Sequence, residues 1–254
     1  MWQDYEATYK DTLQDPDFLA WREWGARRKA DNIRRVCRGL TFTSVVEIGC
    51  GTGAVLRLLH DSNFAQNYFC CDVSPSAMAF VRSSCPALAE HATVAPAEAL
   101  PFPDSAFDLA ILSHVIEHLE NPLVALREAS RVARFVLVEV PTEKVAINVV
   151  RTRILGKPYP SIAGAGHVQF WSPASAASFL EAEAHLEIIS RHQDLLDDEF
   201  GIDHSNGHEM RQLLKRALRG WIPSSIYARL VTTHATFLCR PRFSKVAESA
   251  AVSA

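Results

Sequence analysis

Five short apolar runs, separated by segments with helical patterns, constrain the fold of this chain more than any other feature. Each run is apolar on both faces, which suits a strand that helices cover on both sides. The alternation of strand and helix predicts an α/β, Rossmann-like, doubly wound and mostly parallel sheet. The runs are Val45–Ile48, Tyr68–Cys71, His91–Val94, Phe107–Leu112 and Phe135–Val140.

Helix-start signals lie between and after these runs. A capping residue stands before a proline at the first helical position in Ser74-Pro75, Asn121-Pro122 and Ser172-Pro173, an arrangement typical of helix N-termini. Two later runs, Leu186–Ser190 and Thr233–Arg240, are expected to complete the sheet, the final strand running antiparallel.

The whole chain, 1–254, is predicted to form a single domain around a core at 41–140. Residues 1–40 are expected to form an N-terminal helical cap, with an amphipathic helix that Asp15-Pro16 opens. Residues 141–171 and 193–230 are insertions at strand ends, the usual places for lids and substrate contacts. We expect these three segments together to build the acceptor side of a binding site.

Composition narrows the class of protein. The formal net charge of −3 argues against a general polyanion binder, so no nucleic-acid partner is expected. No run approaches the roughly 18 apolar residues of a membrane span, and the first residues lack the basic and apolar regions of a signal peptide. The six cysteines form no C-x-x-C pair, which favours reduced core thiols in a cytoplasmic protein.

A glycine-rich turn follows the first predicted strand. Gly49, Gly51 and Gly53 lie between Val45–Ile48 and a predicted helix at Ala54–His60. Glycine lets the backbone approach a ligand closely, and the helix N-terminus offers free N–H groups. Asp72 ends the next run, where a carboxylate can accept hydrogen bonds from both hydroxyls of a ribose. The pattern indicates a nucleotide-like cofactor, and Gly49-x-Gly51-x-x-Ala54 also fits a dinucleotide fingerprint.

Further motifs separate the two cofactors. In order and spacing, residues 40–140 closely resemble the class I S-adenosylmethionine-dependent methyltransferases. A later segment, Gly166–Trp171 before a capped helix, is similar to one in small-molecule members. The motifs are Glu47-x-Gly49-x-Gly51-x-Gly53, Asp72-Val73-Ser74-Pro75, Ala97-Glu98-Ala99-Leu100-Pro101-Phe102, Phe107-Asp108-Leu109-Ala110 and His114-Val115-Ile116-Glu117-His118.

The resemblance implies a role for each matching residue in binding S-adenosylmethionine. Gly49, Gly51 and Gly53 would form the turn under the methionyl and ribose portions, and Glu47 would brace it near the amino group. Asp72 would take the ribose hydroxyls and Val73 would lie against the adenine. Ala97 and Glu98 would border the adenine edge, and Ser113 would sit near the methionyl group. Many relatives have an acid before Ala-Glu, where this chain has Pro96, which puts the adenine contact in doubt.

Methyl transfer requires mainly that the acceptor be held in line and that water be excluded. A general base is needed only if the acceptor carries a proton. His114 and His118 follow the fourth run and His167 lies in the 141–171 connection. Imidazole titrates near neutrality, so each is a candidate catalytic base, although His118 could equally be a packing residue.

The segment His114-x-x-Glu117-His118 also matches the inverted zinc-protease signature. That mechanism needs both histidines on one face of a long helix and a further ligand downstream. Here the segment follows a buried strand and a new helix begins at Asn121-Pro122. We therefore expect no catalytic metal.

The resemblance also bears on the acceptor. Nucleic-acid amino methyltransferases of this fold usually carry an Asn/Asp-Pro-Pro-aromatic element where this chain has Ser113–Ile116. A small-molecule or lipid-like acceptor is left as the leading class. Two alternatives stay open: an NAD(P)-dependent oxidoreductase and a non-catalytic cofactor-binding module. The basic, amphipathic residues 209–230 could contact a membrane surface, although such helices more often pack on their own domain.

Overall fold

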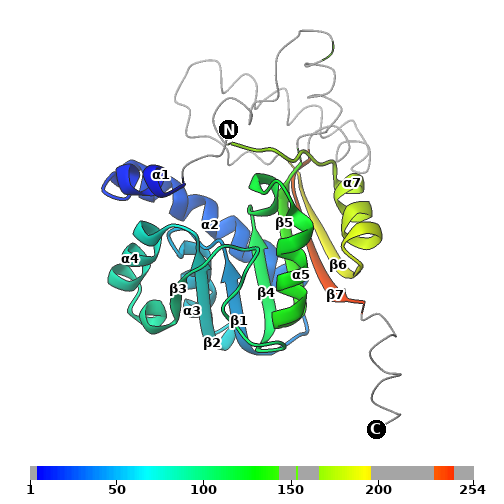
Figure 1. The fold of residues 1–254 in the computed structure, drawn as a ribbon, viewed down its shortest axis with the longest axis horizontal. Helices are drawn as coiled ribbons and strands as arrows, with labels where there is room; N and C mark the ends of the chain where they lie inside the picture. Colours follow the sequence, from blue (N-terminus) through cyan, green and yellow to red (C-terminus); the bar gives the residue numbers. More distant parts are fainter. Residues whose placement is uncertain (1–4, 143–152, 154–165, 196–231, 243–254) are drawn as a thin grey trace.

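The structure is a computed structural model that describes residues 5–142, 153, 166–195 and 232–242 (Figure 1). Its centre is a seven-stranded sheet of order β3-β2-β1-β4-β5-β7-β6. The first five strands pair in parallel, and β7 is antiparallel to both of its neighbours. This confirms the Rossmann-like sheet with an antiparallel last strand. The strands are β1 Phe42–Ile48, β2 Ala65–Asp72, β3 Ala92–Val94, β4 Phe107–Ser113, β5 Ala133–Pro141, β6 Leu186–Leu195 and β7 Thr232–Pro241.

The helices begin where the sequence predicts. Asp15, Ser74 and Ser172 each accept a backbone N–H of the helix that they precede, whereas the side chain of Asn121 makes no capping bond. The helices and short turns are α1 Tyr5–Thr12, α2 Pro16–Val36, α3 Ala54–Asp61, α4 Pro75–Ser84, η1 Pro86–His91, η2 Ile116–His118, α5 Pro122–Val132, α7 Pro173–Ser178 and η4 Phe179–Glu183.

Two apolar layers cover the sheet, one on each face. Ile33 of α2, Leu56 of α3 and Met78 of α4 pack on one face, and residues of α5 and α7 pack on the other. The adjacent side chains of Cys70 and Cys71 belong to opposite layers, as expected for neighbours on a strand. Burial on both faces explains why the strands appear in the sequence as unbroken apolar runs.

Several strand boundaries differ from the prediction; β1, for example, begins at Phe42 rather than at Val45. β6 continues to Leu195 because Gln193 and Asp194 pair with β7, so the expected 193–230 insertion begins with strand residues. β2 starts at Ala65, and His91 ends η1 rather than opening β3. Pairing with a neighbouring strand overrides the local polar pattern in β6. The proposed helix at 209–230 and most of the 141–171 connection lie outside the described residues.

Among the described residues, none of the helices combines the length and apolar character that crossing a bilayer demands.

Candidate active site

The turn after β1 has the backbone that the glycines predict. Gly49, Gly51 and Gly53 all have positive φ angles, of 71°, 55° and 71°. A Cβ on Gly49 would lie 2.6 Å from Cγ2 of Val115, and one on Gly51 would collide with the Tyr9 hydroxyl. A Cβ on Gly53 would meet Val81 instead, so this glycine permits packing against α4. The turn therefore requires glycine because the backbone has positive φ angles and because a Cβ would collide with neighbouring side chains.

Asp72 at the end of β2 is buried and bonded to the same turn. Its Oδ2 accepts the N–H of Gly51 at 2.8 Å, and its Oδ1 accepts the N–H of Ser74 at 2.9 Å. Burial raises the pKa of Asp72, and these two N–H groups oppose that shift. A carboxylate oxygen can accept more than one hydrogen bond, so Asp72 retains capacity for a ligand hydroxyl.

Two adjoining cavities lie beyond the carboxyl ends of β1, β2 and β4. The smaller, about 180 Å³, is lined by Asp72, Val73, Ala97 and Glu98. The larger, about 580 Å³, is lined by Glu47 and His167. Their shared wall brings together predicted residues and residues of α1 and α2: Tyr5, Tyr9, Arg22, Lys29, Gly49, Ser113, His114 and His118. Ligands of doubly wound sheets bind at this edge.

Glu47 is the least satisfied acid at the larger cavity. Its side chain is buried, and its Oε2 has no hydrogen-bond partner among the described residues. Burial raises the pKa of Glu47 to about 8, against the lowering effect of the Lys29 and Arg22 charges. An orphaned carboxylate oxygen of this kind is suited to a ligand that brings a donor.

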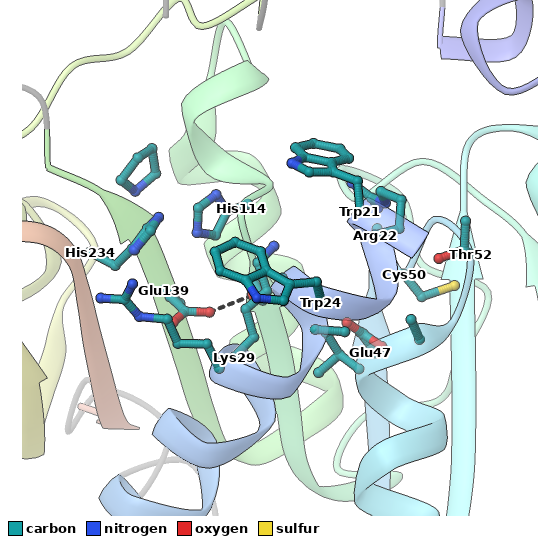
Figure 2. Close-up of a pocket in the computed structure, with 18 of the residues that line it drawn as sticks. Trp21, Arg22, Trp24, Lys29, Glu47, Cys50, Thr52, His114, Glu139 and His234 are labelled. Carbon is teal, nitrogen blue, oxygen red and sulfur yellow. Dashed lines mark hydrogen bonds between the residues drawn. The ribbon is translucent and has the colours of Figure 1, made fainter. Parts of the chain in front are cut away.

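Glu139 organises the other side of the larger cavity, opposite Glu47 (Figure 2). It accepts hydrogen bonds from Asn32 Nδ2 at 3.0 Å, Ser113 Oγ at 2.6 Å and Thr236 Oγ1 at 3.2 Å. Sequence reasoning missed Glu139, although an acid inside the apolar run Phe135–Val140 was a usable signal. A buried carboxylate in a strand needs several hydrogen-bond donors. Here one of the donors is Ser113, and this bond holds its side chain in place.

The N-terminal helices form the wall that the sequence assigned to a cap. Glu6 of α1 accepts from both Ser74 and Ser76 at the start of α4. Arg22 of α2 donates to the Tyr9 hydroxyl at 3.3 Å. Trp21 and Trp24 of α2 line the larger cavity (Figure 2). Residues of α1 and α2 therefore line the larger cavity, as the sequence predicts for the N-terminal helical segment.

The three candidate bases gather on one side of the site. His114 has a positive φ of 59°, a conformation that costs energy outside glycine and asparagine. Its Nδ1 lies 3.4 Å from Oε1 of Glu117, and the rings of His118 and His167 meet edge to face with centroids 4.7 Å apart. Burial lowers the pKa of His114 well below its usual value and that of His118 to about 4. Both imidazoles are neutral at pH 7.

Comparison with known proteins places residues 46–135 in a family described as a methyltransferase domain. A probable S-adenosylmethionine-dependent methyltransferase of Mycobacterium tuberculosis is 32% identical over 119 residues, 47% of this chain and 42% of that protein. A malonyl-[acyl-carrier protein] O-methyltransferase of Hahella chejuensis is 32% identical over 91 residues, 35% of this chain and 32% of that one. The matched stretches thus span less than half of either relative.

Solved structures extend the likeness of the fold. A methyltransferase of Haloferax volcanii, solved with its Trm112 activator, superposes with a TM-score of 0.62 at 18% identity, covering 95% of this chain and all of that one. The N-methyltransferase NodS of Bradyrhizobium japonicum, solved with S-adenosyl-L-homocysteine, gives 0.56 at 14% identity, covering 94% and 99%. The ordered motifs, the matching family model and the fold agree that this chain contains a methyltransferase domain similar to those of S-adenosylmethionine-dependent methyltransferases.

Proposed function

We propose that this protein transfers a methyl group from S-adenosylmethionine to a small-molecule or lipid-like acceptor. The observation that carries the proposal is the pair of adjoining cavities with a shared wall. One has the Asp72 carboxylate that a nucleoside requires, and the other, at about 580 Å³, is within the ordinary range of small-molecule sites. One site for each of two reactants is what a transferase needs.

The described residues fit S-adenosylmethionine. Asp72 has capacity for ribose hydroxyls, and Val73 and Ala97 offer apolar surface for the adenine in the smaller cavity. The unpaired Oε2 of Glu47 suits the cofactor's ammonium group, and Ser113 lies in the shared wall. When bound, the cofactor supplies a methyl group on a positively charged sulfur. Pro96, where many relatives have an acid, lines the smaller cavity together with Ala95 and Glu98.

The chain's own task is to position the acceptor and exclude water. Phe18, Trp21 and Trp24 give the larger cavity an aromatic side, which favours an acceptor with an apolar portion. Arg28 is already paired with Asp194, Nε to Oδ2 at 2.8 Å. Hydrogen bonds from His192 and Asn32, with Arg28, hold the pKa of Asp194 below its usual range although burial opposes the shift.

The cysteines favour a reducing compartment. All six cysteines are free and buried, as in cytoplasmic proteins, and we propose a cytoplasmic location on that ground.

One relative is named for methylating a malonyl group on a carrier protein, so an acyl chain presented by a carrier is within the proposed acceptor class.

Incubation of a host metabolite extract with the protein and methyl-labelled S-adenosylmethionine tests the proposal by mass spectrometry. We expect one labelled product, formed much more slowly by the Asp72→Ala variant when S-adenosylmethionine is limiting. Tight calorimetric binding of NAD with none of S-adenosylmethionine would instead establish the oxidoreductase alternative. Cofactor binding without any labelled product in extracts that contain every host metabolite would favour the non-catalytic module.

A further inference from the structure

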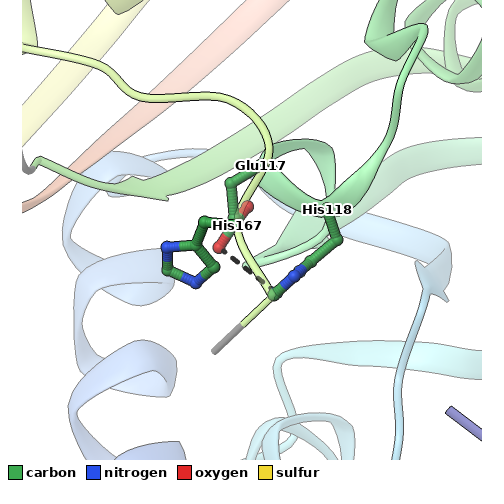
Figure 3. A group of neighbouring side chains, drawn as sticks. All are labelled: Glu117, His118 and His167. Atoms are coloured by element: carbon green, nitrogen blue, oxygen red, sulfur yellow. Dashed lines mark ion pairs between the residues drawn. The ribbon is translucent and has the colours of Figure 1, made fainter. Parts of the chain in front are cut away.

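One carboxylate and two imidazoles meet at the edge of the larger cavity. Glu117, His118 and His167 each present a ligand atom, and these atoms all lie within 4.8 Å of one another (Figure 3). The Glu117 side chain is 0% exposed and that of His118 is 17% exposed. We refer to these three side chains as the Glu-His-His cluster.

The chain holds this cluster together by backbone contacts. Glu117 and His118 belong to η2, directly after β4, and His167 comes from a segment about fifty residues later. The carbonyl oxygen of Glu117 accepts the N–H groups of Val168 at 2.9 Å and Gln169 at 3.0 Å. The side chain of Gln169 donates to the Leu119 carbonyl at 3.3 Å. His167 is therefore placed beside Glu117 by its own neighbours and not by chance contact of long side chains.

Two imidazoles and one carboxylate are the donors that divalent transition metals prefer. Metal–ligand bonds of about 2.0–2.2 Å place the donors of one ion roughly 3–3.5 Å apart. The Oε1 of Glu117 and Nε2 of His118 are 3.9 Å apart. Side-chain rotations that draw the three donors together by roughly an ångström would complete the geometry. Three protein ligands leave further coordination positions open.

We propose that Glu117, His118 and His167 bind one divalent transition-metal ion whose open positions face the larger cavity. His118 and His167 both line that cavity, so the ion would be reached from the acceptor side. There it would hold an oxygen atom of the acceptor and lower the pKa of an acceptor hydroxyl. This role in acceptor binding rests on the proposed function, whereas metal binding itself does not.

The sequence spacing pointed to a different set of ligands. The inverted zinc-protease signature pairs His114 with His118, but the cluster that the structure brings together contains His167 and excludes His114. The absence of a long helix, which argued against a zinc hydrolase, has no bearing on this site. The ligand that completes it lies in a connection whose path the sequence did not give.

Metal binding is measured on the full-length protein after removal of metals with EDTA. Co²⁺ is added and its visible absorption recorded, and Zn²⁺ affinity is obtained by competition with a coloured chelator. We expect one ion per chain. His118→Ala and His167→Ala should each weaken Zn²⁺ affinity by at least about 100-fold, since even loss of a group behind a ligand costs 10- to 100-fold. His167→Asp, which keeps a ligand oxygen, should retain more affinity than His167→Ala.

His60→Ala is the matched control, because His60 also lies beside a carboxylate, with Nδ1 3.4 Å from Asp61 Oδ1. It is on α3, outside both cavities, and should bind Zn²⁺ as the unaltered protein does. Equal affinity of the unaltered protein, His118→Ala and His167→Ala would overturn the proposal, as would no binding by folded protein. Calorimetry with S-adenosylmethionine on the same samples tests the proposed function separately from the metal site. Cofactor binding without metal binding contradicts only the metal site, and metal binding without cofactor binding contradicts only the proposed function.

Discussion

The Asp72 carboxylate at the end of β2 accepts the backbone N–H of Gly51, in the turn after β1, at 2.8 Å. One bond thus joins two strand ends and aims the carboxylate across the smaller cavity. The same acid that would bind the ribose therefore also orders the turn beneath it.

Replacement of Asp72 by alanine should weaken S-adenosylmethionine binding without unfolding the protein. Charge-assisted hydrogen bonds contribute about 1.5–3 kcal/mol, equivalent to roughly ten- to a hundred-fold in affinity. Isothermal calorimetry measures the affinity and circular dichroism the fold. Asp61→Ala removes a half-exposed carboxylate of α3 and should leave binding unchanged. A folded Asp72 variant with undiminished affinity would remove this residue from the cofactor site.

Gly49→Ala should destabilise the protein and impair cofactor binding. A positive φ costs a residue other than glycine about 1–3 kcal/mol, and the new methyl group would lie 2.6 Å from Cγ2 of Val115. Adding Val115→Ala removes the collision but leaves the backbone strain. Chemical denaturation of both single variants and the double variant should show a favourable coupling of about 1 kcal/mol. Strict additivity would show that the two side chains do not meet.

Glu6→Ala should loosen α1 from α4, because it removes the acceptor for Ser74 and Ser76. We expect faster hydrogen exchange in α1 and weaker cofactor binding, by up to about ten-fold, since Tyr5 and Tyr9 would leave the shared wall. Lys10→Ala, an exposed change on the same helix, is the control. Unaltered exchange in α1 would show that these hydrogen bonds do not anchor the helix.

Glu47→Gln should change how stability depends on pH. Burial raises the pKa of folded Glu47 to about 8, from an ordinary value of 4.5. Between these values the unfolded chain loses the proton that the folded chain keeps, so rising pH favours unfolding by up to about 1.4 kcal/mol per unit. Relative to the Gln variant, the unaltered protein should therefore lose stability from about pH 4.5 to 8. The free energies of unfolding of both proteins are obtained from urea denaturation at pH 5 and pH 7.5. If their difference is the same at the two pH values, the raised pKa is contradicted.

The sequence predicted every strand of the sheet because each central strand is apolar on both faces. The turn glycines were also predicted, because their positive φ angles depend on local backbone geometry. The role of Asp72 toward a ribose stays a prediction. Arg22 and Lys29 were missed because nothing local shows that one face of α2 turns toward the strand ends. The neighbourhood of Glu117 and His167 was equally hidden, because it depends on the path of a connection between β5 and α7.

The position of Tyr9 and Arg22 over Gly51 has a kinetic consequence. Both side chains also line the wall shared by the two cavities, so we expect them to lie against a bound cofactor. We therefore expect the spent cofactor to dissociate slowly, and its release, rather than the chemistry, to limit turnover. Pre-steady-state mixing should then show a burst of the first equivalent of product, and the demethylated cofactor should be a potent inhibitor with a long residence time.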